Sequence, residues 1–362
     1  MKKLAVNLAM ALAALALAFF AAEMVVRWLM ADTTVLFPRY HTGYQYGEYR
    51  LRGTRPNETY HHTSIDGRWQ FVTNSKGFRD TREFAYEKPP GIFRVLVLGD
   101  SHTQGFEVRQ EATYAAIAER ALAARGGKVE VINAGVAGFG TAEELVFLEN
   151  EGARYHPDLV VLGFFANDYE DNFKSDLFAL DARGELRARG HSHVPGVGMQ
   201  DFIYALPGVK WMSENSYFYS QLFNSAWVFY KIRLGMQATG KKAGDLAGFA
   251  LPAELTPSAQ EIALAASLVV RMKGFCDAHG MALIVADIPV YLERFRFKTS
   301  LAPEMRARLE AAGVELVDSE PLLQPYAGAV DIHVPNGYHH ISEFTHAMIG
   351  AELARRVHSR SR

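Results

Sequence analysis

The sequence predicts an α/β protein, a three-layer α/β/α sandwich built around a central parallel sheet of five strands. Two observations lead to this prediction. Five short runs rich in Val, Leu and Ile end in Gly, Asn or Asp, and such runs are typical of buried parallel strands. Segments with helical spacing separate these runs, and repeated strand–helix units imply a parallel sheet with helices on both faces.

Each expected element can be placed on the chain. The strands lie within residues 93–99, 129–135 and 159–168, and at 282–287 and 314–318. The intervening helices are expected at 113–125, 141–151, 258–278 and 303–312. The Pro89-Pro90-Gly91 turn marks the entry to the first strand.

The N-terminus differs in character from the rest of the 362-residue chain. Lys2 and Lys3 precede an uncharged apolar stretch over 4–22, close to the ~20 residues that span a bilayer. A secretory signal has the same composition, but Phe19 and Phe20 spoil the small-residue cleavage pattern. We expect an uncleaved signal anchor over 1–30, with a cytoplasmic N-terminus and the rest of the chain in the periplasm. The protein would then be a single-pass inner-membrane protein.

Two further regions are expected outside the core. Residues 31–91 are predicted to be a β-rich extension, and residues 92–362 the main domain. Residues 170–257 are too long for an ordinary loop and are predicted to be a lid-like insertion with some helix. Its aromatic side chains would form a small local core or cover an acyl pocket: Phe218, Tyr219, Phe223, Trp227, Phe229 and Tyr230.

The composition gives limited information about function. The chain is 49% hydrophobic and 22% charged with a net charge of −2, which gives no support for nucleic-acid binding. Cys276 is the only cysteine, so no intramolecular disulfide can form, and core packing is its expected role.

The most informative motif is Gly99-Asp100-Ser101 at the end of the first strand. The carboxyl ends of the strands are where open α/β sheets bind ligands. Gly135 and Asn167 follow the second and third strands, and His340 precedes the last expected helix. Strand-end Ser, Gly and Asn with a late His, in that order, resemble the SGNH (GDSL) hydrolase family. The resemblance runs from residue 93 to the C-terminus, apart from the insertion, and implies a flavodoxin-like fold.

The resemblance also implies roles for these residues. Ser101 would be the nucleophile and His340 its general base, because serine needs a base and histidine titrates in the right range. The oxyanion hole would be formed by the backbone N–H groups of Ser101 and Gly135 and by the side-chain amide of Asn167.

The acid of the triad is less evident. The family places an aspartate three residues before the catalytic histidine, where this chain has Gly337. We expect Asp331 to orient His340 if the loop doubles back. Two alternatives stay open: a backbone carbonyl could orient the histidine in a Ser–His dyad, or Asp331 and His333 could be the working pair.

The remaining polar residues near these motifs have ordinary interpretations. Asp100 would hold the turn after the first strand, and Asp168 would cap the next segment. A surface or packing role is expected for His333, His339 and His346. Their spacing lacks the i+4 partner that zinc motifs require, so no metal and no cofactor are expected.

The predicted function is an extracytoplasmic serine hydrolase acting on a carboxylic ester, acetyl esters included. Its partners would be an ester-bearing small molecule, lipid or glycan and the inner membrane, with no nucleic acid. The alternatives are an O-acyltransferase acting on an envelope glycan and a non-catalytic binding protein of the same fold. The glycines of 135–140 are spaced in reverse of a dinucleotide loop, and the Gly-x-Ser-x-Gly elbow is absent, so an oxidoreductase and an α/β-hydrolase are disfavoured.

Overall fold

The computed structural model describes residues 1–362 except 39, 240–255, 337, 359, 361 and 362, so Gly337 lies outside the described residues. The predicted fold class is confirmed: five parallel strands form a central sheet in the order β14-β11-β7-β5-β6. In chain order this is the 2-1-3-4-5 arrangement of flavodoxin-like sheets. The strands are β5 (Phe93–Gly99), β6 (Val129–Asn133), β7 (Leu159–Phe164), β11 (Ala282–Asp287) and β14 (Glu315–Val317).

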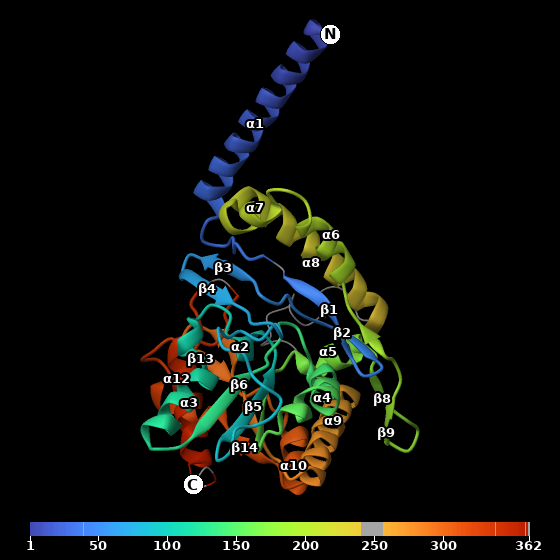
Figure 1. Cartoon of the computed structure of the whole chain (residues 1–362), viewed down its shortest axis with the longest axis vertical. Coiled ribbons are helices and arrows are strands. Elements are labelled where there is room, and N and C mark those ends of the chain that lie inside the picture. The colour runs from blue at the N-terminus through green and yellow to red at the C-terminus, as the bar shows by residue number, and fades with distance from the viewer. Residues whose placement is uncertain (39, 240–255, 337, 359, 361–362) are drawn as a thin grey trace.

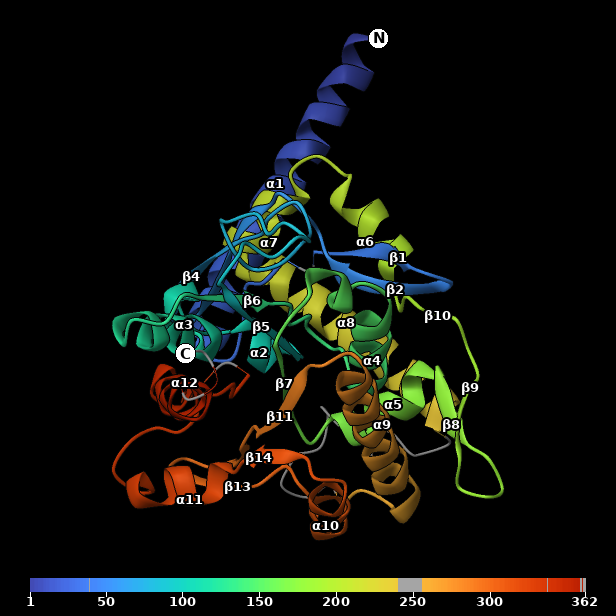
Figure 2. The ribbon, with the colours of Figure 1, turned by 60° about the horizontal axis from the view of Figure 1, so that its bottom comes forward.

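Helices cover both faces of this sheet (Figures 1 and 2). One layer contains α3 (Tyr114–Ala124) and α12 (Glu343–Val357), and the other contains α4 (Thr141–Asn150), α5 (Asp168–Ser175), α9 (Ala259–Ala278) and α10 (Pro303–Ala311). Successive residues of a strand point to opposite faces. In β5, Val95 and Val97 join the core under α3 and α12, whereas Leu96 and Leu98 join the core under α4 and α9.

The predicted elements match the observed ones to within one or two residues at their ends, except that β7 ends at Phe164, four residues before the end of the expected run. Local sequence explains where two of the helices begin. Ser258 caps α9 and exchanges hydrogen bonds with Glu261 in a capping box, and Pro303 occupies the first turn of α10.

The segment before the core contains one long helix and two hairpins. Helix α1 (Lys2–Met30) buries none of its residues and projects from one end of the molecule (Figure 1). The hairpins are β1 (His41–Tyr46) with β2 (Tyr49–Thr54), and β3 (Thr59–Ser64) with β4 (Gly67–Val72). Tyr60 and Phe71 of the second hairpin share a small core with Phe106, which follows Ser101 closely in the chain. The second hairpin therefore lies against the carboxyl edge of the sheet.

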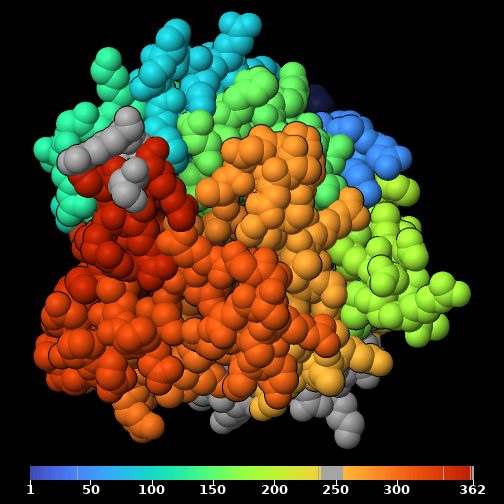
Figure 3. Space-filling view, turned by 90° about the horizontal axis from the view of Figure 1, so that it is seen from below, coloured from blue at the N-terminus to red at the C-terminus, as the bar shows by residue number. Residues whose placement is uncertain are grey.

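The expected insertion does contain helices. The described part of the insertion contains β8 (Phe178–Leu180), β9 (Leu186–Ala188), β10 (Ser192–His193), α6 (Val197–Tyr204), α7 (Val209–Asn215) and α8 (Tyr217–Thr239). Helices α6, α7 and α8 form a layer at the end from which α1 projects (Figure 1), whereas the opposite end is formed mostly by the last third of the chain (Figure 3, orange to red). Three of the expected aromatics stack along α8: Tyr219, Phe223 and Trp227.

A few short elements complete the described part of the chain. Helix α2 (Ser101–Gln104) follows β5 directly. The others are β12 (Val290–Glu293), β13 (Arg296–Lys298), α11 (Ser319–Leu323) and 3₁₀ turns at Gln110–Ala112, Gly152–Tyr155 and Gln324–Tyr326.

Candidate active site

Ser101 is presented by a tight connection between β5 and α2. Gly99 has φ +150°, and a Cβ there would collide with the side chain of Thr103. Asp100 then accepts a hydrogen bond from the His102 N–H at 2.8 Å and caps α2, in agreement with its expected structural role. The turn holds Ser101 as the first residue of α2, at the carboxyl edge of the sheet.

His340 lies directly beside this serine. Its Nε2 is 2.9 Å from Ser101 Oγ, although 239 residues separate the two in the chain. The imidazole is packed between two rings, with centroid distances of 4.7 Å to His102 and 5.4 Å to Phe106. Burial lowers the pKa of His102 well below its usual range, so this neighbour stays neutral, and its Nδ1 accepts a hydrogen bond from the Ile341 N–H.

The other nitrogen of His340 contacts a carboxylate that the sequence analysis did not single out. His340 Nδ1 is 3.1 Å from Glu107 Oε2, and the Tyr338 N–H donates to Glu107 Oε1 at 3.0 Å. Glu107 is buried, and its φ of +60° is uncommon for a residue other than glycine. The surrounding contacts therefore hold a strained backbone in place so that this carboxylate meets the histidine.

Electrostatics favour the ionised form of Glu107. Burial alone would raise its pKa, but the hydrogen bond and charge of His340, the charge of His62 and the Tyr338 N–H bring the pKa below its ordinary value. His62 Nε2 lies 3.8 Å from the other carboxylate oxygen. Ser101, His340 and Glu107 thus form a continuous hydrogen-bonded chain in the order hydroxyl, imidazole and carboxylate.

Asp331 does not occupy the position expected for it. Its two carboxylate oxygens accept hydrogen bonds from Arg294 at 3.0 and 3.2 Å, and the pair lies at the surface. The Ser342 hydroxyl donates to the Asp331 backbone carbonyl, so the loop does double back, but it leaves the Asp331 side chain beside Arg294. We therefore correct the sequence-based choice of Asp331 to Glu107.

Neither alternative arrangement is present either. His333 Nε2 contacts the Pro289 carbonyl at 2.8 Å and is not paired with Asp331. His340 Nδ1 contacts a carboxylate, so no backbone carbonyl orients it. The only signal for Glu107 in the sequence was weak: a single charged residue between Phe106 and Val108, two side chains suited to a core.

The two other residues expected at the oxyanion hole, Gly135 and Asn167, differ in their hydrogen bonds. The Gly135 N–H already donates to Asn133 Oδ1 at 3.1 Å, and a Cβ on Gly135 would lie 2.6 Å from the Gln104 nitrogen. Close packing against α2 therefore explains this glycine. Asn167 follows β7, the neighbour of β5, and its Nδ2 donates to Asp171 Oδ2 at 2.9 Å. This contact orients the amide and leaves its second N–H for another acceptor.

Several carboxyl groups are buried near the same edge. Burial raises the pKa of Asp100 to about 6 and that of Glu143 to about 7, and it raises the pKa values of Glu144 and Asp168 well above the ordinary carboxyl value. Asp168 is the first residue of α5 and accepts a hydrogen bond from the Thr141 hydroxyl at 3.0 Å. The N-cap position expected for Asp168 is taken by Asn167.

The remaining candidates have packing roles. His346 is buried and its Nδ1 accepts a hydrogen bond from the Tyr114 N–H at 3.0 Å, and His339 stacks on Tyr291 with centroids 4.1 Å apart. Cys276 is fully buried, and burial raises its thiol pKa to about 12. Across the described residues, no group of three or more His, Cys, Asp or Glu side chains is arranged to hold a metal ion.

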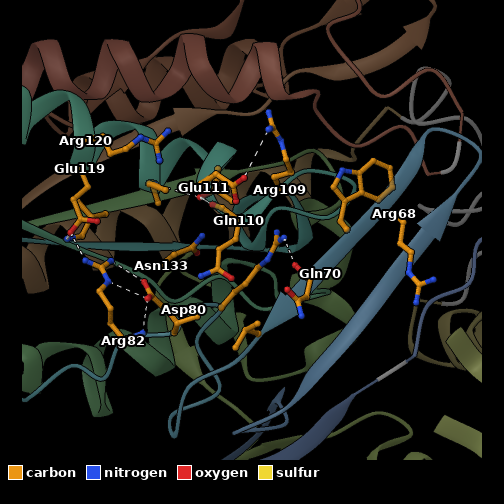
Figure 4. Close-up of a pocket in the computed structure, with 18 residues that line it drawn as sticks. Arg68, Gln70, Asp80, Arg82, Arg109, Gln110, Glu111, Glu119, Arg120 and Asn133 are labelled. Carbon is orange, nitrogen blue, oxygen red and sulfur yellow. Dashed lines mark hydrogen bonds and ion pairs between the residues drawn. The ribbon is translucent and has the colours of Figure 1, made fainter. Parts of the chain in front are cut away.

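A cavity of about 530 Å³ opens beside this region but excludes the triad (Figure 4). Its lining includes Arg82, which pairs with Asp80 and Glu119, and Arg109, which pairs with Glu343 outside the lining. These arginines are thus already paired within the protein. Because neither Ser101 nor His340 lines the cavity, we do not assign it to the reaction.

Comparison with known proteins finds a family match for part of the chain. Residues 97–226 match the model of the GDSL-like Lipase/Acylhydrolase family, and this segment contains Ser101, Glu107 and Asn167. Residues 97–226 are therefore similar to a GDSL-like lipase/acylhydrolase domain. The expected hydrolase of ester bonds is therefore confirmed. His340 lies beyond the matched segment, so its place in this GDSL-like hydrolase comes from the 2.9 Å contact with Ser101.

Solved structures similar to this GDSL-like hydrolase include a lipase/acylhydrolase from Enterococcus faecalis, 16% identical, covering 74% of this chain and 96% of that chain with a TM-score of 0.42. TesA is 14% identical, with 74% and 99% covered and a TM-score of 0.40. An acetylxylan esterase from Geobacillus stearothermophilus is 11% identical, with 73% and 93% covered and a TM-score of 0.39. No curated protein matches the chain.

Proposed function

We propose that this hydrolase cleaves a carboxylic ester through an acyl-enzyme on Ser101. The observation that carries the proposal is the hydrogen-bonded chain from Ser101 Oγ to His340 Nε2 (2.9 Å) and from His340 Nδ1 to Glu107 Oε2 (3.1 Å). In the first step Ser101 Oγ attacks the ester carbonyl carbon while His340 takes its proton. The tetrahedral intermediate collapses, and His340 returns the proton to the departing alcohol.

In deacylation, a water molecule takes the place of Ser101 as the attacking group, and Ser101 becomes the leaving group. His340 removes a proton from a water molecule, which attacks the acyl carbonyl, and the proton then passes to Ser101 Oγ as the carboxylic acid leaves. Glu107 acts as a positioning residue, because it holds the imidazole in one tautomer and stabilises the imidazolium that forms. The Ser101 N–H and the Asn167 amide are the proposed oxyanion donors, because both follow neighbouring strands at the same sheet edge.

We also propose that α1 anchors the enzyme in the inner membrane with the catalytic domain in the periplasm. Helix α1 is long and apolar enough to cross a bilayer and buries none of its residues. The lysines before it favour a cytoplasmic N-terminus. Ester-bearing lipids, glycans or exported small molecules would then be the accessible substrates. A reporter that requires export, fused to the C-terminus, should be active, and an active cytoplasmic reporter would exclude this location.

The nucleophile is tested with the full chain in detergent. A fluorophosphonate probe should label the wild type on Ser101, and Ser101→Ala should take no label and lose nearly all turnover of p-nitrophenyl esters. The chain length of the preferred acyl group follows from a panel from acetate to palmitate. Parallel reactions with added sugar acceptors distinguish transfer from hydrolysis. A folded wild type that neither takes label nor turns over any ester would favour a binding protein instead.

A further inference from the structure

The carboxylate of Glu23 joins the C-terminal part of α1 to the insertion. Glu23, near the end of α1, accepts hydrogen bonds from the hydroxyl of Ser216 at 2.7 Å and from the N–H groups of Tyr217 and Phe218 at 3.0 and 2.9 Å. These are the donors that open α8, so Glu23 from a distant part of the chain caps this helix. The orientation of α8 is thereby linked to that of α1.

Two further contacts strengthen this junction. Arg27 donates to Glu23 and to the Asn215 carbonyl, each at 2.6 Å, and lies 4.6 Å from the centroid of the Tyr217 ring. The rings of Phe19 and Phe218 meet edge to face with centroids 5.5 Å apart. The charged pair therefore lies just beyond the apolar stretch of α1, where a spanning helix leaves the hydrocarbon region.

Next to this junction, the insertion exposes an unusual number of large apolar side chains. Phe202, Trp211 and Phe229 are 68%, 65% and 66% exposed. The insertion's apolar surface consists of these three and of Met199, Leu206 and Leu222. In α8, Leu222 and Phe229 are two turns apart and so lie on one face of the helix. Single exposed apolar residues are ordinary in soluble proteins, but these six lie on or beside α6, α7 and α8, which form one layer next to α1 (Figure 1).

We propose that the insertion's apolar surface docks on the lipid bilayer, with its aromatic rings in the membrane interface. Helix α8 of the insertion contacts α1, and the inference rests on the proposed anchoring by α1. Trp28, near the base of α1, is 85% exposed, and aromatic residues favour the headgroup level of a membrane. Helices with exposed apolar faces lie shallowly in this zone.

Docking would also orient the catalytic centre. The carboxyl edge of the sheet, where Ser101 lies, points toward the end of the molecule from which α1 projects (Figure 1). An ester carried at the bilayer surface is therefore the substrate class that this arrangement favours.

The test places single labels on the full-length protein in phospholipid vesicles. Phe202→Cys, Trp211→Cys and Phe229→Cys variants are each labelled with an environment-sensitive fluorophore, and quenching by lipids that carry nitroxide groups is measured. Cys276 is fully buried, so the unmodified chain serves as the blank. Val270→Cys is the matched control, because Val270 is an exposed apolar residue (40%) on helix α9, away from α1. Trp28→Cys reports on anchoring by itself.

Docking predicts that lipid quenching at 202, 211 and 229 is several-fold stronger than at 270 and close to that at 28. Quenching at 28 with values at 202, 211 and 229 equal to that at 270 would overturn the docking proposal and leave the anchor intact. Labels at 202, 211 and 229 that are shielded from water but not quenched by lipid would indicate contact with a second copy of the chain. This result would also overturn the docking proposal. Loss of quenching at 28 would refute the anchor itself. Ester turnover is measured on the same samples, so a failure of docking or of anchoring can be told apart from a failure of the proposed hydrolysis.

Discussion

Replacing Glu107 with glutamine tests the triad most directly. The substitution removes the negative charge beside His340 but keeps the size of the side chain and one oxygen acceptor. That oxygen can still accept the Tyr338 N–H, which donates to Glu107 at 3.0 Å in the native protein. Folding should therefore survive while the support for a charged imidazolium is lost.

The expected loss of rate follows from the geometry. The Nδ1–Oε2 distance of 3.1 Å places the two charge centres about 4 Å apart, where opposite unit charges interact by about 4 kcal/mol at an effective dielectric constant of about 20. Because His340 gains a proton from Ser101 on the way to the transition state, loss of this interaction adds to the barrier. Glu107→Gln should lower kcat/KM about 10³-fold.

The assay is turnover of p-nitrophenyl acetate, with thermal unfolding of each variant as the folding control. Glu107→Asp retains the charge and should recover part of the lost rate. Asp331→Asn is the matched control: it also removes a carboxylate near the histidine loop, but one that pairs with Arg294 at the surface. Its activity should stay within about twofold of wild type, because exposed ion pairs contribute little.

Two results would refute this reasoning. A folded Glu107→Gln enzyme with near-native kcat/KM would show that the carboxylate does not assist His340. A large loss in Asp331→Asn would restore Asp331 as the working acid and require the loop to rearrange in solution.

Three other predictions follow from the same region. Asn167→Ala should lower kcat about 10² to 10³-fold with little change in KM, as for loss of an oxyanion donor; an unchanged kcat would remove Asn167 from the site. Gly135→Ala retains the backbone N–H but should destabilise the protein to urea by about 1 to 3 kcal/mol, because its Cβ would lie 2.6 Å from the Gln104 nitrogen. Burial raises the pKa of Glu144 in the folded state, so stability is full at low pH and falls as pH rises. Glu144→Gln should therefore raise the melting temperature at pH 8 and change it little near pH 4, and equal shifts at both values would contradict this.

The fold was predictable because its signals are local. The apolar runs of β5, β7 and β11 mark buried strands, and the helix between two such runs shows that they pair in parallel. The helices expected from residues 258 and 303 begin within one residue of those positions. The insertion was recognised by the loss of this pattern, but neither its topology nor its junction with α1 was predicted, because both depend on contacts between residues almost 200 positions apart.

The site was only partly predictable for the same reason. Ser101 and Asn167 follow the ends of strands, so the order of the sheet places them at one edge. Glu107 carries no motif, and its role becomes visible only when the loop containing His340 folds back onto it. Gly135 shows the reverse case: its place after a strand suggested an oxyanion donor, whereas packing against Gln104 is what the structure shows.

By itself, therefore, the sequence determined the parallel sheet, the serine after its first strand, the late histidine and an apolar helix at the N-terminus. Each of these is encoded within a few consecutive residues through periodicity, turn chemistry or hydrophobicity. Only the tertiary structure decided which carboxylate meets His340 and where the insertion's apolar surface lies relative to α1. Both depend on long-range packing, which brings together side chains whose separation in sequence carries no information about their distance in space.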